Sequence, residues 1–305
     1  ANMLFLRCLV NLGLFSVCNR DLLGKAMDYF NRAHKIISTF VGREGAQQNV
    51  KWAEDVEAGI LHSLGICQQR LGMHREVEKS FLQLTVRRPE LPWTHLARAN
   101  ALMDQGSALA GGQASEAQQR RQQQLRDKAK SEYEFAVQLD GQDMSAQIGL
   151  AYCIQVSGDP VEALNSIEVA IAGFSRPQSE KQSFCDPGVI EYPLASRKEL
   201  LALAHDCQGV IQLQLGRRRQ AVQSLANAVG FDGNNPDILV NYGVALQLCD
   251  QVQAAMKHYK TAIQVCPHHK LANYHRGLLY LINAQLHQAR DTLNRALLSD
   301  TIQTG

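Results

Sequence analysis

The sequence predicts an all-α protein built as an array of antiparallel helical hairpins. Alanine, leucine and glutamine, which form helices readily, dominate the 305 residues, whereas only 8 prolines and 6% aromatic residues are present. Small residues also recur inside helical segments at a fixed spacing of 34 residues. The chain is otherwise ordinary for a folded protein, with 45% hydrophobic and 20% charged residues.

The recurrence is clearest in the last third of the chain. Gly209, Gly243 and Gly277 lie 34 residues apart, each inside a helical segment such as "ILVNYGVALQL" at 238–248. Twelve residues after each glycine comes an alanine, then a large residue four further on, then another alanine three beyond: Ala221, Leu225, Ala228; Ala255, Tyr259, Ala262; Ala289, Leu293, Ala296. A helical glycine costs about 0.5–1 kcal/mol relative to alanine, so its repetition indicates that two helices must approach closely there.

This pattern resembles the tetratricopeptide repeat, a helix–turn–helix unit with L-G-x-x-Y followed by A-x-x-x-F-x-x-A and a closing proline. The resemblance covers about three-quarters of the chain, although the tryptophan and tyrosine places of the family mostly hold other residues. It implies a right-handed α-solenoid of about seven hairpins. Four units are expected in 1–177, at about 7–40, 58–91, 92–143 and 144–177, and three in 202–305. In the first unit Gly13 stands one residue out of step.

Three insertions interrupt the repeats, at 41–57, about 107–128 and 178–201. We expect the first to end in an early start of the next helix, and the second to break at Gly111-Gly112 and then prolong the following helix. The third separates four units from three, either as a linker or as a loop that packs in the groove. Asp159-Pro160, Asn235-Pro236 and Ser196 with Glu199 predict helix starts.

Charge and cysteine content narrow the possible partners and location. The net charge is +2, from 31 basic and 29 acidic residues, which gives no broad electrostatic case for nucleic acid or an anionic membrane. Eight cysteines occur without a C-x-x-C pair, which indicates reduced, structural thiols in a cytoplasmic or nuclear protein. No apolar run has the length of a membrane span or the layout of a signal peptide, so we expect no membrane insertion.

The sequence contains none of the motifs that carry catalysis. There is no H-E-x-x-H, phosphate-binding loop or G-x-S-x-G, and the ten histidines are scattered, with His95 interpreted as a surface or half-buried residue. We therefore predict no catalytic, cofactor or metal site, no small-molecule substrate and no enzymatic activity. The chain begins without a methionine, which leaves open that it is a piece of a longer protein. We expect further residues or a partner chain to cover Leu278, Leu281, Ile282 and Leu297.

The resemblance implies protein recognition through the inner wall formed by the first helix of each hairpin. The expected peptide-binding residues are Leu203, Asp206, Val210, Leu213, Val240, Asn241, Val244, Leu248, Tyr274, His275, Leu278 and Ile282. We expect a partner helix or extended segment with aliphatic anchors, its backbone hydrogen-bonded by Asn241 and His275. The leading hypothesis is a non-catalytic scaffold or adaptor within a larger complex. The alternatives are a regulatory arm of a larger enzyme and a cargo receptor similar to the peroxisomal import receptor.

One partner class is predicted not to bind. Family members that hold heat-shock chaperone tails clamp a carboxylate with lysines, asparagines and an arginine. The corresponding places here are Asp206, Val210, Asn241, Leu271 and His275 in units five to seven, and His62, Ile66, Ala97, Ser145 and Gly149 in units two to four. Only Asn241 matches, so titration calorimetry with a free EEVD peptide should show no micromolar binding. A micromolar Kd would contradict the assignment of these places.

Overall fold

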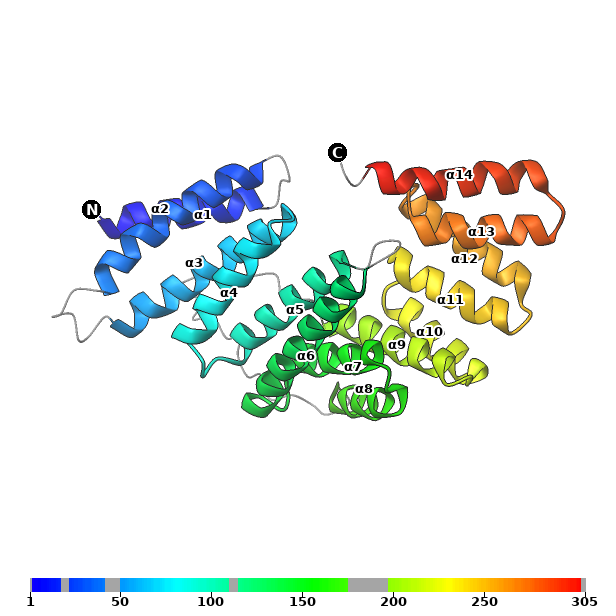
Figure 1. Cartoon of the computed structure of the whole chain (residues 1–305), viewed down its shortest axis with the longest axis horizontal. Coiled ribbons are helices and arrows are strands. Elements are labelled where there is room, and N and C mark those ends of the chain that lie inside the picture. Colours follow the sequence, from blue (N-terminus) through cyan, green and yellow to red (C-terminus); the bar gives the residue numbers. More distant parts are fainter. Residues whose placement is uncertain (1, 18–21, 42–49, 110–114, 175–196, 303–305) are drawn as a thin grey trace. The chain divides into compact units, whose positions relative to one another are not determined.

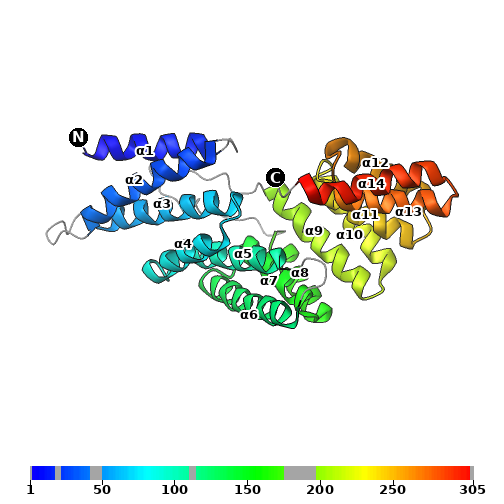
Figure 2. The ribbon, with the colours of Figure 1, turned by 45° about the horizontal axis from the view of Figure 1, so that its top comes forward.

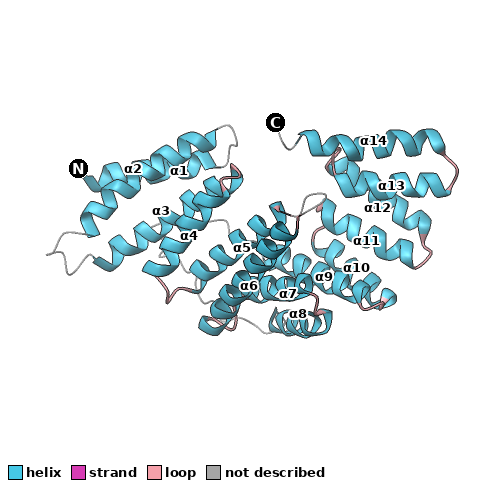
Figure 3. Cartoon of the chain, in the orientation of Figure 1, coloured by secondary structure: helices cyan, strands magenta, loops and turns pink. Residues whose placement is uncertain are grey.

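The computed structural model describes residues 2–17, 22–41, 50–109, 115–174 and 197–302, and they form fourteen α-helices joined by turns (Figure 1). No strand occurs among these residues (Figure 3). The chain divides into two compact units, whose described residues run up to Cys153 in unit 1 and from Ile154 onward in unit 2.

The fourteen helices pair into seven consecutive hairpins, as the repeat predicts. Unit 1 holds α1 (Asn2–Val17), α2 (Leu23–Val41), α3 (Val50–Arg70), α4 (His74–Arg87), α5 (Pro92–Ala108) and α6 (Glu116–Leu139). The boundary between the units falls within α7 (Met144–Ser157). Unit 2 continues with α8 (Pro160–Phe174), α9 (Arg197–Gln214), α10 (Arg218–Phe231), α11 (Pro236–Leu248), α12 (Val252–Val265), α13 (Lys270–Ile282) and α14 (Leu286–Ile302). The grouping of 1–177 against 202–305 stays a prediction, and most of the insertion at 178–201 lies outside the described residues.

Each hairpin closes by fitting a glycine of its first helix against a large side chain of its second. A Cβ atom placed on Gly243 would lie 2.4 Å from Cε1 of Tyr259, and one on Gly209 would lie 2.4 Å from Cγ of Leu225. The flanking alanines of the second helices, such as Ala255 and Ala262, are fully buried. Small residues therefore let the helices approach while the large side chain fills the space between them.

The turn inside each hairpin requires a left-handed residue seven places after the packing glycine. Gly72, Gly158 and Gly216 hold the equivalent place with φ of +71°, +100° and +73°. In the last two hairpins the same place is taken by Asp250 (φ 61°) and Ala284 (φ 59°). Aspartate is enriched in this region and alanine is not, so the final hairpin carries local strain at Ala284.

The first helices of unit 2 form one row. Besides its partner in each hairpin, α11 contacts α9 on one side and α13 on the other. Figure 2 shows the same pairing from another direction, with α9 beside α10 and α13 beside α14. The stacking places equivalent faces of α9, α11 and α13 next to one another.

Helix starts and insertions follow the sequence-based expectations. Asp159 Oδ1 accepts hydrogen bonds from the backbone of Val161 (3.2 Å) and Glu162 (3.0 Å), and Asn235 caps α11 in the same way. Helix α9 begins at Arg197, directly after Ser196. The second insertion becomes the start of α6, which Ser115 and Gln118 open with a capping box.

The first hairpin satisfies the same packing rule with a different spacing. A Cβ atom on Gly13 would lie 2.7 Å from the Phe30 ring, so Gly13 fills the packing place although it is one residue out of step. The glycine and its large partner are 17 residues apart in α1 and α2, compared with 16 in the later hairpins. The connecting turn therefore takes up one extra residue while the helix contact is kept.

The glycine contact gives a stability test with an internal control. Gly243→Leu should lower the free energy of unfolding by about 1–3 kcal/mol, because the side chain overlaps the buried Tyr259 ring. Gly230→Leu is the matched control, since Gly230 is an exposed residue of α10 with no atom within 4 Å of its added Cβ. Thermal unfolding followed by circular dichroism would compare them. Equal effects would contradict the close approach at Gly243.

Candidate peptide-binding surface

The predicted binding residues gather on adjacent faces of α9, α11 and α13. Along each helix they are separated mostly by three or four residues, so they share a face. A hydrogen bond from Asn241 of α11 to Asp206 of α9 shows that these faces meet. We call them the first-helix surface: Leu203, Asp206, Val210, Leu213, Asp237, Asn241, Val244, Leu248, Leu271, Tyr274, His275, Leu278, Leu281 and Ile282.

Much of the first-helix surface is apolar and accessible. Six of its large hydrophobic side chains are between 41% and 73% exposed: Leu203, Leu248, Leu271, Tyr274, Leu281 and Ile282. The half-buried residues Val210, Leu213, Val244 and Leu278 lie between them. A soluble chain seldom places so many large apolar side chains on one face unless that face is covered by another group.

One predicted surface residue belongs to the core instead. Val240 is only 2% exposed and packs in the cluster that contains Leu239, Tyr259 and Leu279. The equivalent residue of α13, Tyr274, is 45% exposed. The difference arises because α11 has a first helix on both sides, and these neighbours cover its middle. Periodicity alone could not distinguish the two positions.

Asp206 is the main polar feature of this surface. Asn241 Nδ2 donates hydrogen bonds to Asp206 Oδ1 (3.0 Å) and Oδ2 (3.1 Å). Burial raises the pKa of the Asp206 carboxyl to about 6, the hydrogen bond from Asn241 lowers it, and the charge of Asp237 raises it further. The expectation that Asn241 holds a partner's backbone therefore needs revision, because its amide donor is already engaged.

His275 lies among aromatic rings on α13 and α12. It stacks on the Tyr259 ring, with centroids 5.6 Å apart, and meets the Tyr274 ring edge-on at 5.3 Å. Burial lowers the pKa of His275 below its usual value. At neutral pH His275 is thus an uncharged, partly aromatic part of the surface.

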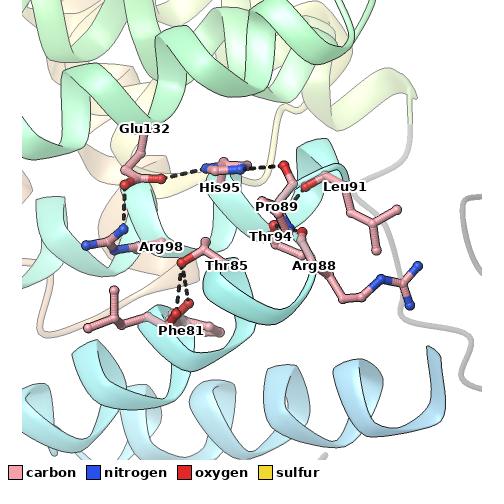
Figure 4. A network of polar contacts seen from close by, with 10 residues as sticks. Phe81, Thr85, Arg88, Pro89, Leu91, Thr94, His95, Arg98 and Glu132 are labelled. Carbon is pink, nitrogen blue, oxygen red and sulfur yellow. Dashed lines mark hydrogen bonds and ion pairs between the residues drawn. The ribbon is translucent and has the colours of Figure 1, made fainter. Parts of the chain in front are cut away.

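A separate polar network connects α5 to α6 in unit 1 (Figure 4). His95 contacts Glu132 Oε2 through Nδ1 (2.7 Å) and the Pro89 carbonyl oxygen through Nε2 (2.9 Å), and Arg98 Nη1 donates to Glu132 Oε1 (2.6 Å). The prediction of a surface or half-buried His95 is wrong, since only 8% of the residue is exposed. Its partners come from distant parts of the sequence, and no local pattern could reveal them.

Other ionisable groups in the described residues have structural contacts. Glu57 is buried in a recess between α2, α3 and α4, where it contacts Arg87 and His34 Nε2 (3.1 Å). Burial raises the pKa of the Cys67 and Cys153 thiols to about 11, so these free cysteines pack as small apolar side chains. Within the described part, no cluster of three His, Cys, Asp or Glu could hold a metal ion. None of the described helices combines the length and apolar character needed to cross a membrane.

Comparison with known proteins places the chain among tetratricopeptide-repeat proteins. No protein-family model matches it. Human tetratricopeptide repeat protein 6 is 23% identical over 241 residues, which are 79% of this chain and 39% of that protein. The chain thus spans about two-fifths of this relative.

Solved structures show the same fold. A tetratricopeptide repeat protein from Parabacteroides merdae has a TM-score of 0.61 at 11% identity, covering 96% of this chain and 92% of that one. TTC0263, a thermophilic protein of this class in Thermus thermophilus, has a TM-score of 0.53 at 17% identity, covering 81% and 100%. The chain is therefore an all-α solenoid of the tetratricopeptide-repeat class.

The raised pKa of Asp206 predicts a pH-dependent gain in stability when its charge is removed. The carboxyl has a pKa near 6 when folded and about 3.9 when unfolded, so the folded state binds more protons between these values. Its contribution to the free energy of unfolding falls as pH rises through this window. Asp206→Asn, which keeps an acceptor for Asn241, should raise Tm by about 2–4 °C at pH 8 and have little effect at pH 4.

The matched control is Asp250→Asn, which removes one negative charge from an exposed turn and suits its left-handed backbone. Differential scanning calorimetry at both pH values would compare each variant with the unaltered chain. A gain for Asp206→Asn that is the same at pH 4 and pH 8 would rule out the raised pKa as its cause.

Proposed function

We propose that the chain is a non-catalytic scaffold that holds a segment of a partner protein on its first-helix surface, as part of a larger assembly. The observation that carries this proposal is the group of six exposed apolar side chains on α9, α11 and α13. Covering them would remove a large apolar area from water, at roughly 25 cal/mol per Å² before the costs of association.

The shape of the surface supports a peptide or helix rather than a small molecule. Its exposed residues extend over three neighbouring helices, from Leu203 through Leu248 to Ile282. An elongated partner can place successive apolar side chains along such a row, whereas a small ligand needs an enclosed pocket. Tyr274, aromatic and half-exposed, is suited to act as a central anchor.

The proposal is tested by altering the surface without altering the fold. Val244→Asp with Leu278→Asp places two charges in the middle of the surface, and Leu248→Gln with Ile282→Gln removes two exposed anchors. We expect each pair to reduce the recovery of bound partners by at least about tenfold. The measurement is affinity purification with cross-linking mass spectrometry, which also reports whether the links fall on α9, α11 and α13.

The matched control changes an equally exposed pair elsewhere in unit 2. Val161 and Val169 of α8 are 58% and 63% exposed and lie outside the first-helix surface, so Val161→Gln with Val169→Gln should leave recovery unchanged. Circular dichroism would verify that all variants remain folded. If the folded surface variants still capture every partner of the unaltered chain, this surface is not the binding site.

A further inference from the structure

The first-helix surface carries negative charge and no compensating cation of its own. Asp206 and Asp237 are its two acidic residues, and His275 is kept uncharged by burial. No lysine or arginine occupies any of its positions. The nearby Arg276 is directed to Tyr280, whose hydroxyl accepts from Nη2 at 2.7 Å and whose ring lies 5.2 Å from the guanidinium carbon.

The hydrogen-bond donor that the structure places at Asp206 is neutral. Both carboxylate oxygens accept from the same nitrogen, Asn241 Nδ2. A carboxylate has about four acceptor sites, so this contact leaves capacity for a further donor on a half-buried group. A cation here would interact more strongly than on an open surface, because the local dielectric is lower.

Asp237 is also held by a neutral donor. His269 Nδ1 accepts a hydrogen bond from the Ala272 backbone N–H (3.2 Å), which caps α13. An N–H group can only donate, so Nδ1 must carry a lone pair and the proton lies on Nε2. Nε2 then donates to Asp237 Oδ1 at 2.9 Å as part of an uncharged imidazole. Protonating His269 fully would break this cap, so the fold favours the neutral ring.

Two like charges therefore lie close together within an apolar surface, and each is held by a neutral group. The charge of Asp237 acts on Asp206 directly, since it opposes ionisation of that carboxyl. One cation placed near Asp206 would relieve both its desolvation and this repulsion. A segment with only aliphatic residues would cover Asp206 without compensating its charge, which is costly.

Building on the proposed function, we propose that the first-helix surface selects partner segments that carry an arginine or lysine among aliphatic residues. The aliphatic side chains cover Leu248, Leu271 and Ile282, and the cation pairs with Asp206 beside Asp237. The same charges disfavour an acidic segment and a nucleic-acid backbone. Arginine suits the site best, because its planar guanidinium can donate to carboxylate oxygens in pairs.

The test uses four synthetic 15-residue helical peptides with identical aliphatic residues at helical spacing and a central Arg, Lys, Gln or Glu. Fluorescence anisotropy with the intact chain at pH 8 should give Kd values about tenfold lower for Arg and Lys than for Gln, and the weakest binding for Glu. Asp206→Asn should remove the preference of Arg over Gln while leaving the Gln peptide's Kd unchanged. Asp250→Asn should keep the preference.

The outcomes separate this inference from the proposed function. Equal binding of the Arg and Gln peptides, lost on Val244→Asp with Leu278→Asp, would overturn the selection of a cation and keep the apolar surface. Failure of all four peptides to bind would overturn both. An Arg preference that survives Asp206→Asn would also overturn the assignment to Asp206.

A pH series gives a second readout. Between pH 8 and pH 5 the Arg preference should decline, because Asp206 takes up a proton near pH 6. His269 and His275 also face this region and gain positive charge at low pH, and both effects weaken binding of a cation. The decline that is absent in Asp206→Asn is the part due to Asp206. An equal decline in the variant would contradict the proposal.

Discussion

The close fit between a small residue of one helix and a large residue of the next is the contact on which the structure depends. In unit 2 it recurs as Gly209 with Leu225, Gly243 with Tyr259 and Gly277 with Leu293, and in each pair an added Cβ would overlap the partner. The contact fixes the distance between the two helices of a hairpin and uses one face of each first helix. It therefore determines which face remains free for binding.

The free face is a consequence of stacking as much as of sequence. In α11 and α13 the residues at equivalent places differ in exposure according to the number of neighbouring first helices, as Val240 and Tyr274 show. Binding residues in such an array are consequently not a fixed set of repeat positions. They are those positions that the neighbouring hairpins leave uncovered.

Periodic features could be predicted from the sequence, and features that join distant residues could not. The hairpins, their capped starts at Pro160 and Pro236, and the turn glycines follow from spacing and local backbone preference. The packing role of Gly13 escaped a strict repeat because the turn after α1 is longer by one residue. The contacts of His95 with Glu132 and of Asn241 with Asp206 each join residues more than 30 positions apart, and no local pattern encodes them.

Asp206 shows how these two kinds of information combine at the candidate site. Its place on the free face follows from the repeat, but its electrostatic state follows from burial, from a neutral donor and from a second carboxylate nearby. An ionised group that is partly desolvated and lacks a cation lowers the stability of the free chain. Such local costs are expected where a surface is adapted to a partner rather than to stability. A cationic group on a bound segment would supply the interaction that the free chain lacks, which links the instability of this position to the selection of its partner.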